Sequence, residues 1–455
     1  MSNKDKNYGR MESVVSRRAL LKGIVVTGTA AGAGGLLASC GSDDDAATET
    51  AATEAPVVAE TSKGTIKIGF VTPQTGPLAP FGEADAFVIG ELRNYVASGY
   101  EGFTIEILER DSESNSNTAA TTVQELIGEG CQLILAEGTP DTTVPVVQQC
   151  TNNEIPCITN NAPWQPHYLG IGGQLGPGVT PGVASEYNYH FFWGLEDVVQ
   201  VFLAMWNDAV PGGKVGALWP DDPDGNAWSD PNVGFPPALA AGGFTLVDPG
   251  RFPLGGNDYS AQIAKFKDEG VEIVTGVLPP PDFANFWAQA QQQGFAPKVV
   301  TVGKALLFPG AIESYANPAG ISTEIWWSDR HPYTSSLTGQ TAADLAAAYT
   351  ASTGRQWTQP VGYVHALFEV ALDAIKRAGG ADDKQALLDV IGATNMETIA
   401  GTVNWGNSVV PHVTKTPLVG GQWVKGSEFP YELKIRTSEQ LPSLTVDGPM
   451  ELIEL

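Results

Sequence analysis

The sequence predicts an α/β protein built from two doubly wound units, each a mostly parallel sheet with helices on both faces. Three observations support this fold class. Short apolar runs alternate with helical patterns through most of the chain. The first run, which includes Ile66, Ile68, Phe70 and Val71, is almost continuously apolar, as in strands buried on both faces. The alternation restarts after a Gly/Pro-rich segment at 162–182, which we expect to be a surface loop.

The first unit opens with a strand that breaks at Pro73 and Gly76-Pro77, followed by a helix from about 82 to 98. The remaining elements expected in this unit are strands at 103–108, 132–136 and 156–160 and helices at 118–128 and 142–152. Ligands of such sheets bind beyond the carboxyl ends of the strands, so the loop at 75–82 is a candidate wall of a site. The alternative is a purely structural turn.

The second unit shows the same alternation. Its expected strands are at 214–219, 244–247, 271–278 and 298–302. One expected helix ends near 209, and two others cover 261–269 and 283–293. Strong helical patterns follow at 341–353 and 361–378, and short hairpin-type strands are expected at 398–404, 417–424 and 431–435. The resemblance between the two units is architectural, because no repeat of fixed period is visible.

Composition restricts the function. The chain has 455 residues, of which 42% are hydrophobic and 17% charged, and its formal net charge is −26. This fits a globular protein with an ample core and argues against nucleic acid or an anionic lipid surface as a partner. The five histidines lack zinc-ligand spacing, and the acidic stretch from Asp221 to Asn226 lacks most ligand positions of a Ca²⁺ loop. We therefore expect no metal, no cofactor and no catalytic residue.

The N-terminus has the features of an export signal. Ser16-Arg17-Arg18-Ala19-Leu20-Leu21-Lys22 resembles the twin-arginine signal, and a weakly apolar run at 23–38 is too short to span a bilayer. The run ends in Leu37-Ala38-Ser39-Cys40, which resembles the lipobox of bacterial lipoproteins. Residues 1–39 are therefore predicted to be a cleaved lipoprotein signal peptide and Cys40 the lipidated N-terminus, the alternative being an ordinary signal peptide with a chance cysteine.

Residues 40–64 are acidic, rich in Thr and Ala and free of aromatic side chains, so they are predicted to be a disordered tether or an inert tail. Three further cysteines are Cys131, Cys150 and Cys157. Because an exported chain can be oxidised, we expect a Cys150–Cys157 disulfide between a helix end and the next strand, with Cys131–Cys157 as the alternative.

Residues 65–440 resemble the branched-chain amino acid type of extracellular solute-binding proteins of ABC importers. The stretches that carry the resemblance are 66–70 with 75–82, 133–138, 155–159, and 257–267 followed by 271–274. The resemblance implies a type I periplasmic-binding-protein fold, in which two lobes joined by three crossings close on a ligand. We place the crossings near His190, Trp327 and His412. Lobe one is then 65–190 plus 328–412, and lobe two is 191–327 plus 413–455.

The resemblance also indicates where a ligand would bind. Loops after two lobe-one strands match the stretches that hold a ligand's polar groups, with Thr139, Asp141, Thr142 and Asn161 as candidates, although Asp141 or Thr142 also suits a helix cap. Tryptophans expected near the cleft provide apolar area with one donor each. They are Trp164, Trp228, Trp326 and Trp327, of which Trp228 matches an aromatic position of the family.

One loop departs from the family pattern. Members that bind amino acids present an acid for the ammonium group after a late lobe-two strand, but residues 302–308 contain no carboxylate. Asp282 is a candidate substitute. The departure leaves amides, carboxylates and aromatic solutes open as ligands alongside amino acids.

The leading interpretation is an exported, lipid-anchored, monomeric receptor, not an enzyme, that delivers a small solute to an ABC permease at the outer face of the cytoplasmic membrane. A ligand-sensing module of the same fold is the second interpretation, which a neighbouring kinase or chemoreceptor gene would favour. An exported hydrolase is the third, which turnover of test esters or amides would reveal.

Overall fold

The computed structural model describes residues 62–454, which lie within one compact unit, Glu60–Leu455. This unit contains two large sheets. The first sheet has six parallel strands in the order β13-β5-β4-β3-β1-β2. Its strands are β1 (Thr65–Thr72), β2 (Thr104–Asp111), β3 (Leu133–Ala136), β4 (Cys157–Thr159), β5 (Asn188–Phe191) and β13 (Val413–Thr414). We call this sheet and its covering helices lobe one.

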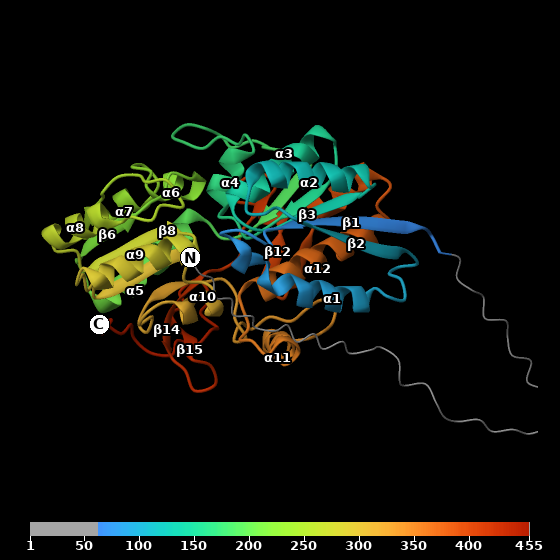
Figure 1. Cartoon of the computed structure of the whole chain (residues 1–455). Helices are drawn as coiled ribbons and strands as arrows, with labels where there is room; N and C mark the ends of the chain where they lie inside the picture. Colours follow the sequence, from blue (N-terminus) through green and yellow to red (C-terminus); the bar gives the residue numbers. More distant parts are fainter. Residues whose placement is uncertain (1–61, 455) are drawn as a thin grey trace, which may run out of the picture. The chain divides into compact units, whose positions relative to one another are not determined.

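Helices cover both faces of the first sheet (Figure 1). The helices α2 (Ser116–Gly128) and α3 (Pro140–Asn152) lie on one face, where they bury Ile134 and Ala136. On the other face α1 (Asp85–Tyr95) and α12 (Pro360–Ala378) bury Leu133 and Leu135. Because successive strand residues point to opposite faces, a strand covered on both sides must be apolar throughout, as the sequence of β3 is. The short elements of this lobe are η1 (Ala79–Ala84), α4 (Trp164–Gly170), α11 (Ala342–Thr353), α13 (Lys384–Gly392), η2 (Trp405–Asn407) and the β11 (Asn395–Thr398)–β12 (Gly401–Asn404) hairpin.

The second sheet has seven strands in the order β15-β14-β10-β9-β8-β6-β7. The five from β10 to β7 are parallel, and β14 and β15 are antiparallel to their neighbours. Its strands are β6 (Lys214–Leu218), β7 (Thr245–Val247), β8 (Ile273–Leu278), β9 (Val299–Lys304), β10 (Ser322–Ile325), β14 (Val419–Lys425) and β15 (Tyr431–Thr437). Its helices are α5 (Leu195–Ala209), α6 (Pro223–Trp228), α7 (Phe235–Ala241), α8 (Ser260–Glu269), α9 (Pro280–Gln292) and α10 (Pro309–Ser314). We call this part lobe two.

The chain passes between the two sheets three times. The passages run from β5 to α5 at 192–194, from β10 towards α11 at 326–341, and from β13 to β14 at 415–418. His190 lies on β5, Trp327 just after β10, and His412 just before β13. The predicted fold class is confirmed. The lobes are in contact, because α6 of lobe two packs against α3 and α4 of lobe one.

The structure corrects two predictions about lobe one. The segment at 162–182 is not wholly a surface loop, because α4 forms within it and buries Trp164 and Tyr168. The predicted Cys150–Cys157 disulfide is not formed, nor is the alternative, since the three described cysteines are free and buried. Burial, the first cause, and the thiol of Cys157 in hydrogen-bond contact raise the pKa of Cys150 well above its usual range. This suppresses the thiolate that disulfide formation requires.

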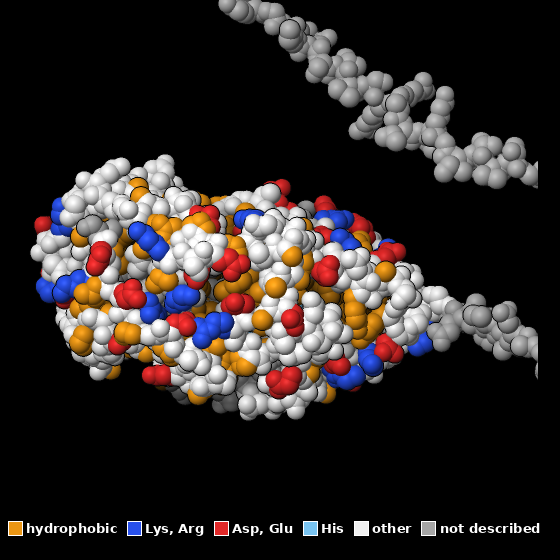
Figure 2. All heavy atoms as spheres, turned by 90° about the horizontal axis from the view of Figure 1, so that it is seen from below, with side chains coloured by type: hydrophobic (Ala, Val, Ile, Leu, Met, Phe, Trp, Pro, Cys, Tyr) orange, Lys and Arg blue, Asp and Glu red, His pale blue; other side chains and the backbone are white. Residues whose placement is uncertain are grey.

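The predicted signal peptide, most of the tether and the lipidation site Cys40 lie outside the described residues. Within residues 62–454, no helix is long and apolar enough to span a bilayer. The face seen in Figure 2 carries acidic and basic side chains interspersed, and neither sign forms a continuous patch there.

Candidate functional site

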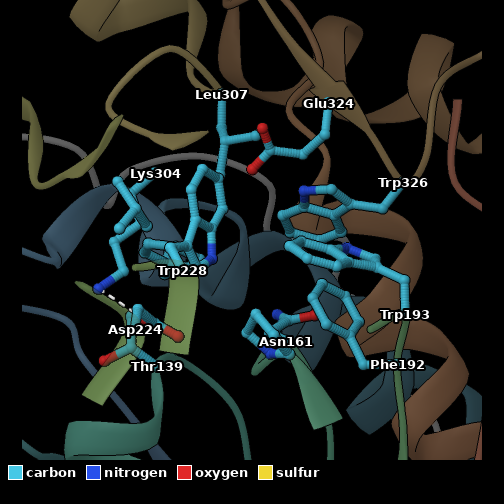
Figure 3. A pocket seen from close by; sticks show the side chains of 13 residues that line it. Thr139, Asn161, Phe192, Trp193, Asp224, Trp228, Lys304, Leu307, Glu324 and Trp326 are labelled. Carbon is cyan, nitrogen blue, oxygen red and sulfur yellow. Dashed lines mark ion pairs between the residues drawn. The ribbon is translucent and has the colours of Figure 1, made fainter. Parts of the chain in front are cut away.

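A pocket lies between the lobes, where strands of both sheets end and two passages begin. The cavity is small in this arrangement of the lobes, about 20 Å³. Its lining residues come from both lobes and from the passages: Phe81, Thr139, Asn161, Pro163, Phe192, Trp193, Asp224, Trp228, Val277, Lys304, Leu307, Glu324 and Trp326. The side chains face one another across the cavity (Figure 3). The carboxyl ends of parallel strands meeting at one edge create this position, as in other doubly wound sheets.

Lobe one contributes neutral polar groups. Thr139 follows β3 and is the N-cap residue of α3, with extended backbone angles. Asn161 follows β4 with a φ of 63°, a left-handed conformation that asparagine tolerates better than most residues. The Asn161 side-chain amide donates to Glu137 Oε2 at 2.5 Å, which holds its Oδ1 towards the pocket.

Lobe two contributes charge and an aromatic ring through α6. Asp222 caps this helix by accepting from the backbone N–H of Gly225 at 2.6 Å, and Asp224 and Trp228 lie on the helix itself. The Trp228 ring packs on Phe235 and approaches the backbone of β9 at Gly303, where a Cβ would lie 2.9 Å from the ring. A glycine at 303 is therefore what allows the indole to lie across the strand end.

A buried ion cluster joins α6 to the end of β9. Lys304, with a φ of 61°, places its Nζ 2.7 Å from Asp224 Oδ2 and 3.1 Å from Asp222 Oδ2. Burial opposes the charge of this lysine, but the two aspartates, assisted by Asp141 of lobe one, raise the pKa of Lys304 above its ordinary value. Burial raises the pKa of Asp224 to about 6, with Lys304 opposing the shift. Burial likewise raises the pKa of Glu324 to about 7.

Six buried polar atoms of the pocket lining have neither a hydrogen-bond partner nor an ion-pair partner among residues 62–454. They are Thr139 Oγ1, Asn161 Oδ1, Asp224 Oδ1 and the indole Nε1 atoms of Trp193, Trp228 and Trp326. An unsatisfied buried polar group costs about 1–3 kcal/mol, so native structures retain few of them. Six around one cavity indicate a site where a ligand supplies the missing partners.

Behind Asn161 lies a pair of buried carboxyl groups. Thr72 Oγ1 is 2.7 Å from both Asp85 Oδ2 and Glu137 Oε1. A hydroxyl has one proton and can donate to only one of them, so the other carboxyl group must itself be protonated and donate to Thr72. Burial is the main cause that raises the pKa of Glu137 to about 7 and that of Asp85 well above its usual range. The loop that carries Asn161 thus packs against a buried carboxyl group that keeps its proton.

Four of the nine residues named as candidates from the sequence line this pocket: Thr139, Asn161, Trp228 and Trp326. Asp141 does not line the pocket but lies near it, because its charge is close enough to Lys304 to raise the pKa of that lysine. Thr142 is buried one position further along α3, and its hydroxyl donates back to the carbonyl of Thr139 at 3.2 Å. Thr142 thus stabilises the helix start and does not reach the cavity.

The structure places the other three predicted residues away from the pocket. Trp164 donates to Glu196 Oε1 at 3.2 Å in a cluster around α4. Trp327 donates to the carbonyl of Ile399 at 3.0 Å and packs against α12 at Gly362, where a Cβ would lie 2.2 Å from the ring. Asp282 accepts from Tyr259 Oη at 2.9 Å and from the backbone of Gly255 at 2.8 Å. Each of the three bonds to groups outside the pocket lining, so the structure does not bring them into this pocket.

Sequence reasoning missed all three charged lining residues, and it missed Phe192 and Trp193 of the aromatic lining. Trp193 and Phe192 directly follow β5 at the first passage, and Trp326 directly follows β10 at the second. A residue in a passage must border the cleft, and this signal was available for Trp193. Lys304 was also present in the loop that lacks a carboxylate, opposite an acidic loop that offered partners.

A second hollow between the lobes has its charged groups paired. It lies between η1 and α9–α10 and includes Glu83, Tyr315 and Arg355 in its lining. Arg355 Nη2 contacts Glu83 Oε2 at 3.0 Å. Among the described residues, no group of three or more His, Cys, Asp or Glu side chains is arranged to hold a metal ion.

Comparison with known proteins places the chain in a family. A family model described as Periplasmic binding protein matches residues 65–427. The chain belongs to this family. The resemblance to the branched-chain amino acid type is supported by a curated relative, Leu/Ile/Val-binding protein homolog 3 of Brucella melitensis, which is 24% identical over 213 residues. The match covers 46% of this periplasmic binding protein and 53% of the relative, so it spans about half the relative's length.

Solved structures share the fold at low sequence identity. A leucine-binding protein of Thermotoga maritima superposes with a TM-score of 0.64 at 18% identity, over 81% of this periplasmic binding protein and 97% of that chain. An ABC-transporter solute-binding protein of Rhodopseudomonas palustris, in complex with 3,4-dihydroxybenzoic acid, superposes with a TM-score of 0.66 at 19% identity, over 84% and 99%.

Proposed function

We propose that this periplasmic binding protein captures a small organic solute in the pocket between its lobes and delivers it to an ABC importer. The observation that carries the proposal is the ring of six unpartnered polar atoms around a pocket built by both lobes. Relatives support a solute of this size, since one is named for leucine, isoleucine and valine and a structural neighbour holds a dihydroxybenzoic acid. Amino acids, amides and related carboxylates are the initial candidates.

The division of the pocket between lobes provides the mechanism. Thr139 and Asn161 can hold a solute on lobe one while the cleft is open, but Asp224 and Trp228 reach it only when lobe two approaches. A solute that contacts both lobes binds the closed arrangement more tightly and so shifts the population towards it. A membrane permease that recognises the closed arrangement would then select the loaded protein.

We propose binding without turnover, as opposed to hydrolysis. Among residues 62–454, two serine hydroxyls contact a histidine ring, Ser328 with His331 at 2.9 Å and Ser335 with His365 at 2.7 Å. All four residues are buried, and none lines the pocket. Neither pair is therefore placed to reach a solute held between the lobes.

Export and anchoring complete the proposal. Cleavage before Cys40 and lipidation of its thiol would tether a monomeric receptor to the outer face of the cytoplasmic membrane, beside the permease. Two acyl chains anchor a protein stably, whereas one chain anchors it only marginally. Mass spectrometry of membrane-extracted protein should show a diacylated N-terminal Cys40, and an unmodified soluble chain that retains residues before Cys40 would contradict it.

A thermal-shift screen of the chain from residue 41 onward tests the proposed function. A solute at a hundred times its Kd should stabilise the protein by about 2.7 kcal/mol. A library of amino acids, amides, amines, carboxylates and aromatic acids that produces no melting shift would contradict the receptor assignment. Hydrolysis of any bound ester or amide would contradict binding without turnover.

A further inference from the structure

The charges around the pocket are unevenly compensated. Lys304 is the only basic residue in the lining, and its ammonium group is engaged with Asp222 and Asp224 at 3.1 and 2.7 Å. Its side chain is only 7% exposed, and the two carboxylates take two of the three ammonium protons and compensate its charge. A solute carboxylate therefore meets no free cation among the lining residues.

Two carboxyl groups belong to the lining, and Asp224 keeps an oxygen open to a solute, whereas Glu324 Oε2 accepts from the Thr323 hydroxyl at 2.9 Å. Asp224 is fully buried, and its Oδ1 has no partner in residues 62–454 although its Oδ2 pairs with Lys304. Glu324 is 2% exposed and makes no ion pair in the described part of the chain. Neutral donors alone can hold an anion, but here these donors share the cavity with acidic groups that would repel it.

The remaining walls are apolar, with five aromatic rings beside Pro163, Val277 and Leu307. Phe81, Phe192, Trp193, Trp228 and Trp326 all line the pocket. Figure 3 shows Trp228 on one side, near Lys304 and Asp224, with Trp193, Trp326 and Phe192 on the other. Indole faces attract cations through the ring quadrupole, and this attraction is strongest where water is excluded.

We propose that the pocket selects a small organic amine, protonated and without a net negative charge, whose ammonium group contacts Asp224 between the aromatic walls. An oxygen atom on the same solute would accept from the unpartnered indole N–H groups. This inference rests on the proposed function and narrows its ligand class: amines are favoured over carboxylates of the same size. The structural neighbour's aromatic acid would be a poor ligand for this chain.

Matched probes test the class. Tyramine and 3-(4-hydroxyphenyl)propionate share a phenol ring and a two-carbon chain and differ in the terminal ammonium or carboxylate. In calorimetric titrations of the wild-type protein, we expect tyramine to bind at least tenfold more tightly than the carboxylate. Equal or tighter binding of the carboxylate would overturn the inference while leaving the proposed function intact. If neither probe binds, the solute of the library that binds most tightly is compared with its analogues of other charge. Tighter binding of an anion, or of an amino acid than of the corresponding amine, would overturn the inference.

Variants test the contact itself. Asp224→Asn should weaken tyramine binding at least tenfold, because it removes the charge whose free oxygen faces the pocket. Asp222→Asn removes the other carboxylate that pairs with Lys304. Asp222 does not line the pocket, so we expect tyramine affinity to fall less than threefold. Equal losses would show that only the summed charge matters and would overturn the direct contact. If Asp224→Asn fails to fold, Glu324→Gln carries the test with an expected loss of at least threefold, and unchanged tyramine affinity would contradict the inference.

Discussion

The two sides of the pocket differ in the kind of group they present and in what holds that group in place. Lobe one supplies neutral groups, Thr139 and Asn161. Behind them lie Asp85 and Glu137, two buried carboxyl groups that share a proton near Thr72. Lobe two supplies all three charged side chains of the lining, of which Lys304 and Asp224 are paired with each other and Glu324 forms no ion pair among the described residues. The comparison indicates that lobe one orients a solute by hydrogen bonds, whereas lobe two selects it by charge and aromatic area.

The largest expected effect comes from removing the cation of lobe two. Lys304→Met leaves buried carboxylates without compensation, and breaking a buried ion pair in this way costs about 3–5 kcal/mol. Chemical denaturation of the ligand-free protein measures the change. The control is Lys298→Met, whose partner Glu272 is also partly exposed, with an expected cost below about 1 kcal/mol. Equal costs for the two variants would show that the cluster at Lys304 is not structurally important.

The buried proton of lobe one gives the second effect. Burial raises the pKa of Glu137 from 4.5 to about 7, so the folded state keeps a proton that the unfolded state has lost above about pH 5. The free energy of unfolding should therefore fall as pH rises from about 5 to 8, by at most about 1.4 kcal/mol per pH unit for one proton. Buried histidines act in the opposite direction below about pH 6.5, since burial lowers the pKa of His167 to about 4.

Glu137→Gln isolates this proton, because it changes one titrating group and leaves the histidines in place. We expect the variant's stability to fall less between pH 5 and 8 than that of the wild type, measured by urea denaturation across this range. Parallel curves for the two proteins would mean that no proton is stored at the Thr72 pair.

A third effect separates unpartnered indoles from satisfied ones. Trp228→Phe removes a buried N–H without a partner, so the ligand-free protein should lose little stability beyond repacking, while a solute that used this N–H should bind about 0.5–1.5 kcal/mol more weakly. Trp206 donates to Thr301 Oγ1 at 2.9 Å, so Trp206→Phe should destabilise the fold and leave affinity unchanged. Denaturation and calorimetry on both variants measure the two quantities, and the reverse pattern would contradict the comparison.

The smallest effect concerns neighbouring threonines of lobe one. Thr139→Ala removes the hydroxyl that faces the pocket, and we expect about 0.5–1.5 kcal/mol of affinity to be lost. Thr142→Ala removes a hydroxyl that bonds only to the start of α3, so affinity should stay the same. If Thr142→Ala weakened binding more than Thr139→Ala, the position of the pocket edge would be wrong.

The fold could be predicted from the sequence because its evidence is local. Buried parallel strands are almost continuously apolar, as in β3 and, except for Thr275, in β8, and their helices begin at recognisable Pro and Thr positions. The α4 helix was missed because Gly and Pro around it suggest a loop, and its stability comes from burying Trp164 and Tyr168.

The candidate site was only partly predictable because it depends on which polar groups find partners in space. Trp228 and Trp327 are both aromatic residues near the cleft in sequence terms, yet only Trp327 has a carbonyl, that of Ile399, within reach of its N–H. Likewise Asp282 Oδ1 accepts from Tyr259, which lies just before α8, whereas Asp224 keeps a free oxygen. Residue type and spacing do not contain this information, since each partner lies more than twenty positions away or on another element.

The central claim is that a solute completes the hydrogen bonds of the three indoles around the pocket. The chain has eleven tryptophans, so the indole N–H region of a ¹⁵N-correlated NMR spectrum, assigned by single Trp→Phe variants, reports on each of them separately. On saturation with the solute that gives the largest melting shift, the signals of Trp193, Trp228 and Trp326 should move, and those of Trp206, Trp287 and Trp423, which donate within the protein, should stay in place. Shifts confined to the second group, with the first three unmoved, would place the binding site elsewhere.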